Sequence, residues 1–171
     1  TKYLIEQGIA HPGKIGLQGH SWSGFQTSYL VTKTDIFACA NIGAPITDMV
    51  TGYLGIRGGS GLPRYFMYEE WQSRMGKSLW EAKDKYLASS AIVEADKIHT
   101  PLLIWHNDKD EAVAYEQGRA LYLAMRRLQR PAWHLNYKGE GHFLGNQAAQ
   151  KDWRPTFVLS NYKTGTTFRI I

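Results

Sequence analysis

Residues 14–24 read KIGLQGHSWSG, and this stretch decides the fold class that the sequence predicts. A short apolar run over Lys14–Gln18 leads directly into glycine, then Ser21, then a helical pattern over residues 23–33. A serine between a buried strand and a helix is typical of a sharp turn that projects the hydroxyl above a sheet. The free N–H groups at the start of the helix then face any anion that forms beside that hydroxyl.

Other interpretations of this segment stay open from its residues alone. Ser21 or Ser23 could instead cap the helix by accepting hydrogen bonds from its first N–H groups. A phosphate-binding loop is disfavoured because no Lys-Ser/Thr pair follows the glycines and Gly-x-Gly-x-x-Gly is absent. Small residues at 19, 23 and 24 favour the strand-to-helix turn, since it brings two backbones close together. Ser23 as the nucleophile would have the wrong register for that turn.

Three more apolar runs predict buried strands, at residues 37–42, 102–106 and 133–137. Each run is nearly continuous in apolar residues rather than alternating, as is typical of parallel strands covered on both faces. Helical patterns lie between the runs, the longest over residues 115–129. This alternation predicts an α/β fold, a mostly parallel sheet with helices on both faces joined by right-handed crossovers.

The segment between the second and third predicted strands is less regular. Residues Gly55–Pro63 contain four glycines and a proline, and they are predicted to be a loop. The spacing of Ser78 and Glu81 is that of a capping box, which predicts a helix from there to about Leu87.

A hydroxyl is a poor nucleophile unless a base removes its proton and a third group orients that base. When a serine occupies this kind of turn, the acid and the histidine follow it in chain order, each on a loop after a later strand. Asp110 lies in NDKDEAV after the third predicted strand, and His142 lies in KGEGHF after the fourth. The sequence therefore predicts that Ser21, Asp110 and His142 meet at one edge of the sheet.

Each of these assignments has competitors. Asp108 and Glu111 flank Asp110, and acidic residues after a strand often cap turns instead. A single histidine in a Gly-rich loop is commonly an ordinary surface residue. The other histidines are less suitable, because they lie within or at the end of strands, in the turn itself, or on the opposite side of the sheet: His134, His106, His20, His11 and His99.

Composition excludes several classes of function. The chain has 171 residues, 43% of them hydrophobic, which is enough for one globular domain with a core. No apolar run approaches the roughly 20 residues of a membrane-spanning helix. The formal charge of +5 comes from scattered residues, and the cluster of Arg126, Arg127 and Arg130 lies at a helix end, where cations are favourable. We therefore expect neither a membrane span nor nucleic-acid binding.

Metal and cofactor sites are also not expected. Cys39 is the one cysteine, which excludes a disulfide within the chain and any site built from several cysteines. No pair of histidines has the spacing that places two imidazoles on one face of a helix.

Three segments together resemble the catalytic domain of the prolyl oligopeptidase family, which includes dipeptidyl-peptidase-like and acylaminoacyl-peptidase-like enzymes. They are Gly19–Gly24, Asp110–Val113 and Gly141-His142. The connecting residues 9–16, 43–45 and 101–106 are similar as well, and the resemblance runs from about residue 1 to residue 153.

This resemblance implies an α/β-hydrolase-type serine peptidase that cleaves peptide bonds through an acyl-enzyme intermediate and needs no cofactor. In such an enzyme Ser21 attacks the acyl carbon, His142 acts as general base and then general acid, and Asp110 holds the imidazole. The backbone N–H of Trp22 would contact the oxyanion. Residues near the pocket for the side chain before the scissile bond would be Met49, Val50, Tyr53 and Val113.

The sequence also departs from the family pattern. Ser23 replaces the first of two glycines that usually follow the nucleophile, and Ala112 stands where many members carry Asn or Arg. The N-terminal β-propeller, the early strands and the second oxyanion donor of such enzymes have no counterpart in the chain. We therefore expect residues 1–171 to be a C-terminal part of the catalytic domain, with those missing parts as its partners. The chain alone need not be active, and its open sheet edge would favour pairing with another copy.

Three functions remain compatible with these residues. A peptidase acting on peptide substrates is the first. An esterase or other acyl hydrolase would use the same three side chains, because many chemistries share this type of scaffold. A non-catalytic binding piece that retains the triad as a relic is the third.

Overall fold

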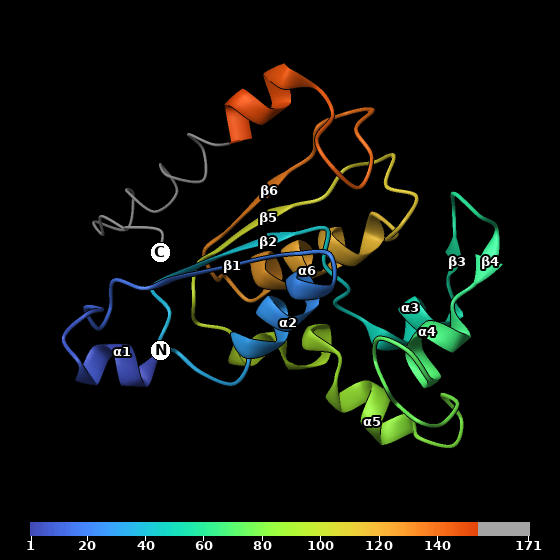
Figure 1. Ribbon diagram of the computed structural model, residues 1–171, viewed down its shortest axis with the longest axis horizontal. Coiled ribbons are helices and arrows are strands. Elements are labelled where there is room, and N and C mark those ends of the chain that lie inside the picture. Colours follow the sequence, from blue (N-terminus) through green and yellow to red (C-terminus); the bar gives the residue numbers. More distant parts are fainter. Residues whose placement is uncertain (154–171) are drawn as a thin grey trace.

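The computed structural model describes residues 1–153, and its centre is a parallel sheet of four strands in the order β1-β2-β5-β6 (Figure 1). The strands are β1 (Gly16–His20), β2 (Cys39–Gly43), β5 (Leu102–Trp105) and β6 (Ala132–Leu135). All three pairings are parallel, and one row of the register joins Gly19, Ile42, Ile104 and His134. The predicted parallel sheet is confirmed, with its carboxyl ends at one edge.

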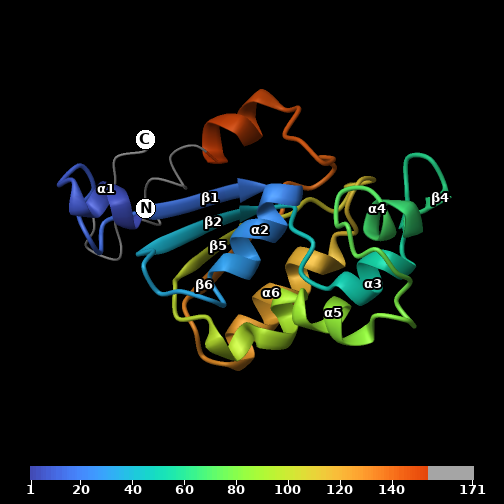
Figure 2. The same cartoon turned by 60° about the horizontal axis from the view of Figure 1, so that its bottom comes forward.

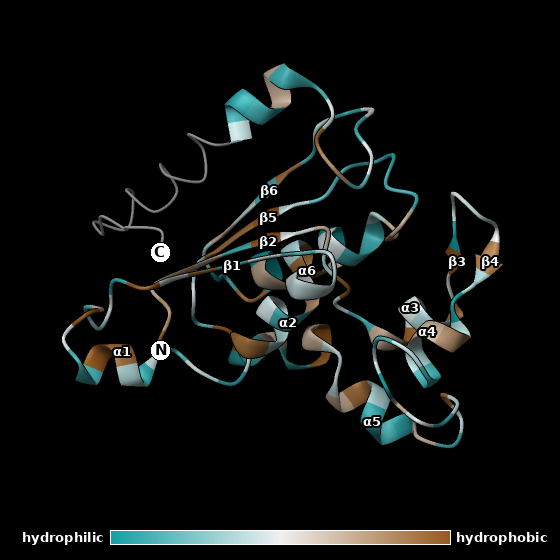
Figure 3. Ribbon diagram, viewed as in Figure 1, coloured by the Kyte–Doolittle hydropathy of each residue, from teal (hydrophilic) through white to brown (hydrophobic). Residues whose placement is uncertain are grey.

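One face of the sheet packs against three helical segments. They are α2 (Trp22–Leu30), the 3-10 helix η1 (Ala91–Lys97) and α6 (Glu116–Arg127). Ile42 and Ile104 from the strands meet Leu121 and Met125 of α6, and all four side chains are completely buried. Helical residues 147–153 lie on the other side of the sheet (Figure 2). Strand β5 is hydrophobic and buried along its whole length, whereas β1 contains hydrophilic as well as hydrophobic residues (Figure 3).

A second hydrophobic cluster lies beyond the carboxyl ends of the strands. It is formed by α3 (Met49–Leu54), α4 (Tyr65–Glu69) and α5 (Lys83–Ala88), which lie together in Figure 1. Edge-to-face contacts join the rings of Tyr53, Tyr68 and Tyr86 at its centre. The side chain of Gln117 connects this cluster to α6, because its amide oxygen accepts from the N–H groups of residues 47 and 48.

The structure corrects the prediction that Gly55–Pro63 is a loop. These residues contain an antiparallel hairpin of β3 (Ile56–Arg57) and β4 (Leu62–Pro63). Each strand is only two residues long, which is too short for a hydrophobic pattern to indicate it.

The boundaries of several predicted elements also move. The Glu81 carboxylate accepts a hydrogen bond from the Ser78 N–H at 3.1 Å, as a capping box requires. However, only a turn follows at once, and α5 begins at Lys83. The first strand covers residues 16–20 rather than 14–18, because Gly19 and His20, which resemble turn residues, still pair with β2.

The amino and carboxyl ends of the strands have different neighbours, because helix α1 (Lys2–Glu6) lies near the amino ends and the second hydrophobic cluster lies beyond the carboxyl ends. Helix α1 contributes no buried side chain, and it precedes β1 at the amino end of the strands. Within residues 1–153, β1 and β6 are the edge strands of the sheet. No helix in this part of the chain is long and apolar enough to cross a membrane.

Candidate active site

Ser21 lies at the junction of β1 and α2 in an unusual backbone conformation. Its φ of 59° and ψ of −119° fall in a region that residues with a side chain rarely adopt. The Ser21 N–H donates to the carbonyl oxygen of Gly43 at 2.8 Å, and its own carbonyl accepts from Phe25 N–H at 3.0 Å. Strand β2 and the first turn of α2 therefore hold this conformation from both sides.

Gly19 and Gly24 allow close backbone contacts around Ser21, whereas Ser23 makes side-chain hydrogen bonds. A Cβ atom at Gly19 would overlap the carbonyl of Ser23, and one at Gly24 would lie 2.6 Å from the carbonyl oxygen of Gly43. The Ser23 hydroxyl donates to the His20 carbonyl at 2.8 Å and accepts from the His20 N–H. Ser21 makes no capping hydrogen bond with its side chain. Ser21 therefore stands at the N-cap position of α2 without capping the helix through its side chain, and the Ser23 hydroxyl bonds to His20 instead of to the first N–H groups of the helix.

The structure brings Ser21, His142 and Asp110 into one line of hydrogen bonds. The distance from Ser21 Oγ to His142 Nε2 is 2.8 Å, and His142 Nδ1 lies 2.7 Å from Asp110 Oδ2. The three residues follow β1, β6 and β5, so they come from three strand ends at one edge of the sheet. Exposure decreases inward, because the His142 side chain is 14% exposed and that of Asp110 is fully buried.

The buried Asp110 carboxylate is surrounded by N–H donors. Its Oδ1 accepts from the backbone N–H groups of Ala112 and Val113, both at 2.8 Å. Its Oδ2 faces His142 and also His106, whose Nε2 is 3.2 Å away. Burial alone would raise the pKa of Asp110, but the hydrogen bonds from His106, His142 and Val113 outweigh it and hold the pKa well below its ordinary value. The group is a carboxylate at neutral pH.

The two competing acidic residues have other contacts. Asp108 accepts a hydrogen bond from the Gly139 N–H at 2.9 Å. Glu111 is exposed, and its carbonyl accepts a hydrogen bond from the Gly59 N–H of the β3–β4 hairpin at 3.4 Å. Neither makes a hydrogen bond to His142.

Asn107 is a site residue that sequence reasoning did not identify. Its amide donates to the carbonyl oxygen of Gly141 at 2.8 Å, and its amide oxygen accepts from the Tyr137 N–H at 3.2 Å. The side chain is buried between the loop that carries the acid and the loop that carries His142. Its place directly after the third strand was a signal, but a pattern search for titratable groups passes over an amide.

His20 forms an uncharged wall beside His142. Its ring stacks on Trp105 with centroids 4.8 Å apart, and the His142 ring is 4.7 Å away. Burial, together with the neighbouring His142, lowers the pKa of His20 to about 4. The stack requires glycine at position 43, where a Cβ atom would overlap the Trp105 ring.

The four residues predicted near a substrate pocket belong to the second hydrophobic cluster. Met49, Tyr53 and Val113 are at most 3% exposed, and Val50 packs against the same cluster. Trp22 packs there as well. Since Trp22 is the first residue of α2, its N–H has no acceptor within the helix.

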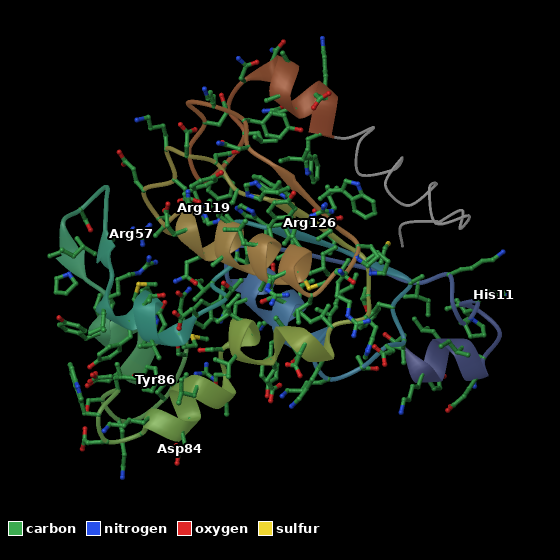
Figure 4. All side chains as sticks on the ribbon, turned by 180° about the vertical axis from the view of Figure 1, so that it is seen from behind. His11, Arg57, Asp84, Tyr86, Arg119 and Arg126 are labelled. Carbon is green, nitrogen blue, oxygen red and sulfur yellow. The ribbon has the colours of Figure 1, made fainter. Side chains whose placement is uncertain are left out.

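A cavity of about 300 Å³ opens beside His142. Ala112 and Gly141 line it, together with the charged residues Arg57, Lys109 and Glu111. Arg57 and Gly59 come from the β3–β4 hairpin, on which Arg57 is labelled in Figure 4, and the other lining residues come from the two loops that carry Asp110 and His142. His11 lies beside α1 at the opposite end of the molecule, as predicted. No group of three or more His, Cys, Asp or Glu residues within residues 1–153 is arranged to hold a metal ion.

Similarity to known proteins identifies the family to which the chain belongs. The sequence model of the prolyl oligopeptidase family matches residues 1–158. The chain belongs to the prolyl oligopeptidase family. The resemblance inferred from the residues around positions 21, 110 and 142 is thereby confirmed, and the match covers nearly all of the chain.

Individual curated peptidases are similar over most of the chain. The uncharacterized peptidase YuxL of Bacillus subtilis is 26% identical over 134 residues, which are 78% of this chain and 19% of YuxL. Dipeptidyl-peptidase 5 of Porphyromonas endodontalis is 27% identical over 161 residues, 90% of this chain and 22% of that enzyme. The chain therefore spans about a fifth of the length of these relatives.

Solved structures support the fold in the same way. A Mycobacterium tuberculosis puromycin-hydrolyzing peptidase superimposes with a TM-score of 0.82 at 21% identity, covering 99% of this chain and 25% of that one. The α/β-hydrolase-type fold predicted for this member of the prolyl oligopeptidase family is confirmed.

Proposed function

We propose that Ser21, His142 and Asp110 are the catalytic triad of a serine peptidase that cleaves peptide bonds through an acyl-enzyme intermediate. One observation carries the proposal. Two hydrogen bonds, of 2.8 and 2.7 Å, lead from the hydroxyl through the imidazole to a fully buried carboxylate. Family membership supports peptide substrates, since the similar proteins named above are peptidases.

The proposed chemistry follows from which atoms carry protons. Asp110 accepts the Nδ1–H of His142, which leaves Nε2 free to take the Ser21 proton as Oγ attacks the substrate carbonyl carbon. The protonated imidazole then donates that proton to the leaving amine. Water attacks the acyl-enzyme with His142 again as the base, and the cycle closes.

The developing oxyanion would lie near the start of α2. The N–H of Trp22 is one donor, and removing a donor of this kind raises a reaction barrier by about 3 kcal/mol. Met49, Val50, Tyr53 and Val113 would form the apolar wall near the pocket for the residue before the scissile bond. Ala112 offers no polar side chain to the cavity beside His142, where Arg57 and Lys109 supply positive charge.

We further propose that residues 1–171 form the C-terminal part of the catalytic domain of a longer peptidase. The chain matches about a fifth of the length of the two curated relatives named above, which supports this division. The remaining parts of such a protein would supply a second oxyanion donor and further sheet strands. The tests below therefore use the full-length protein.

A fluorophosphonate probe tests the proposed function. We expect covalent labelling of the full-length protein, with the modified peptide mapped to Ser21. The Ser21→Ala variant should lose the label, while the control Ser89→Ala, at the end of α5, should keep it. An unlabelled wild-type protein, or a label on Ser23, would contradict the proposal. Hydrolysis of simple esters without hydrolysis of peptide amides would indicate the esterase instead.

A further inference from the structure

His106 is a buried histidine that the proposed reaction does not use. It follows β5 directly, and its side chain is completely buried. Its Nε2 atom lies 3.2 Å from Asp110 Oδ2 and 3.1 Å from the carbonyl oxygen of Val113. Both of these partners are hydrogen-bond acceptors.

The other ring nitrogen fixes the tautomer of His106. The backbone N–H of Gly118, in α6, donates to His106 Nδ1 at 3.2 Å. Because Nδ1 accepts a hydrogen bond there, the ring proton lies on Nε2. His106 therefore offers one N–H to two acceptors, the Val113 carbonyl oxygen at 3.1 Å and Asp110 Oδ2 at 3.2 Å, and Oδ2 is the oxygen that also accepts from His142.

The close approach of α6 to this imidazole explains a glycine within the helix. A Cβ atom at Gly118 would lie 2.7 Å from His106 Nδ1 and 3.0 Å from its Cβ. Glycine is unfavourable within a helix, so its presence at the contact indicates that the contact requires it.

We propose that His106 is a positioning residue, which holds the Asp110 carboxylate in the orientation that His142 needs. This inference rests on the proposed function of Ser21, His142 and Asp110. Oδ1 accepts from two backbone N–H groups, and Oδ2 accepts from His142 and lies 3.2 Å from His106 Nε2, so four donors surround the four acceptor positions of the carboxylate, the N–H of His106 being shared with the Val113 carbonyl. Without His106 one of these positions is empty, and the carboxylate can turn away from His142 Nδ1. His106 acts through Asp110 and makes no contact with the reacting atoms.

The neighbours of His106 supply a matched control. Besides Asp110, the ionisable groups that face it are Tyr115, His20 and His134. His134 lies on β6, pairs in register with Ile104, and packs on the rings of Tyr115 and Tyr122. It is a partly buried histidine of the same region without a hydrogen bond to the carboxylate.

The experiment compares four variants of the full-length protein: His106→Leu, His106→Gln, His106→Asn and the control His134→Leu. Gln can place an amide donor where Nε2 lies, whereas the shorter Asn reaches only the position of Nδ1. The measurements are kcat and KM on a peptide substrate, the pH profile of kcat/KM, the rate of fluorophosphonate labelling, and the midpoint of thermal unfolding.

We expect His106→Leu and His106→Asn to lower kcat about tenfold to a hundredfold with little change in KM, as removal of supporting groups around a reactive centre does. Their pH profile of kcat/KM should also differ from that of the wild type, because a carboxylate that turns away from His142 Nδ1 no longer stabilises the protonated imidazole. His106→Gln should recover most of the kcat and the wild-type profile. His134→Leu should leave both unchanged.

Two results would overturn the inference. One is a His106→Leu variant that matches His134→Leu in kcat and pH profile. The other is an equal loss in the Gln and Asn variants that follows their loss of folded protein. If His106→Leu does not fold, the difference in kcat between the Gln and Asn variants tests the inference by itself. Failure of the proposed function is distinguishable, since the wild-type protein would then not be labelled at Ser21.

Discussion

Asn107 donates a hydrogen bond from Nδ2 to the carbonyl oxygen of Gly141 at 2.8 Å, and so joins the end of β5 to the loop that carries His142. In Asn107→Ala the Gly141 carbonyl and the Tyr137 N–H lose their partner. An unsatisfied buried group costs about 1–3 kcal/mol, and a displaced loop relieves that cost. We expect the labelling rate at Ser21 to fall at least about tenfold, a change equivalent to about 1.4 kcal/mol.

The control for this variant is Asn146→Ala. The Asn146 side chain accepts from the Ala148 N–H in an exposed loop and makes no contact with residue 141. Equal labelling rates in the two variants would show that the Asn107 bridge does not hold His142.

Gly24→Ala should destabilise the turn that carries Ser21. The new methyl group would lie 2.6 Å from the Gly43 carbonyl oxygen, which also accepts the Ser21 N–H. Overpacking of this kind costs about 1–3 kcal/mol. A lower midpoint of thermal unfolding checks this, with Gly145→Ala as the control, because a Cβ atom there meets nothing closer than 3.6 Å. Equal midpoints would contradict the close contact between helix and strand.

Ile104→Ala tests the main core. Ile104 is completely buried between α6 and the sheet, and loss of such a side chain costs about 2–5 kcal/mol through lost burial and the cavity left behind. Ile9→Ala is the control, because Ile9 is 65% exposed and surface substitutions change stability by less than about 0.5 kcal/mol. Thermal unfolding of the two variants should differ clearly. Similar midpoints would mean that the sheet face at Ile104 is loosely packed.

The stability that Asp110 contributes should depend on pH. Its pKa lies below the ordinary value of 3.8 in the folded protein, so the folded state favours the ionised form. The contribution is fully present above pH 3.8 and is lost as the pH falls toward the lower folded pKa. We expect the gap in unfolding midpoint between wild type and Asp110→Asn to narrow from about pH 6 to about pH 3. A gap independent of pH would mean that the carboxylate is not stabilised by its donors.

The sequence predicted the centre of the sheet well because β2 and β5 are buried along their whole length, and such strands have nearly continuous apolar runs. It also predicted which residues meet at the sheet edge. The chain order of serine, acid and histidine, and their places after strands, carry that information without any knowledge of side-chain contacts.

Other parts of the site could not be predicted from sequence patterns. The contacts of His106 and Asn107 depend on distances between segments that are far apart in sequence, and neither residue has a local pattern. His106 was set aside because it ends a strand, yet that position directs its imidazole to the carboxylate of Asp110. The two-residue strands of the hairpin are stabilised by pairing and by contact with Glu111, neither of which leaves a periodic signal.

The backbone angles of Ser21 disfavour any side chain, whereas the proposed reaction needs a hydroxyl at this position. At φ 59° and ψ −119° glycine is the residue of lowest energy, so Ser21→Gly should melt at a higher temperature than Ser21→Ala, although both lack the proposed nucleophile. A chain selected only to fold would therefore drift to glycine at this position. A hydroxyl at a site where the main chain opposes any side chain is what the proposed role of Ser21 as the nucleophile requires.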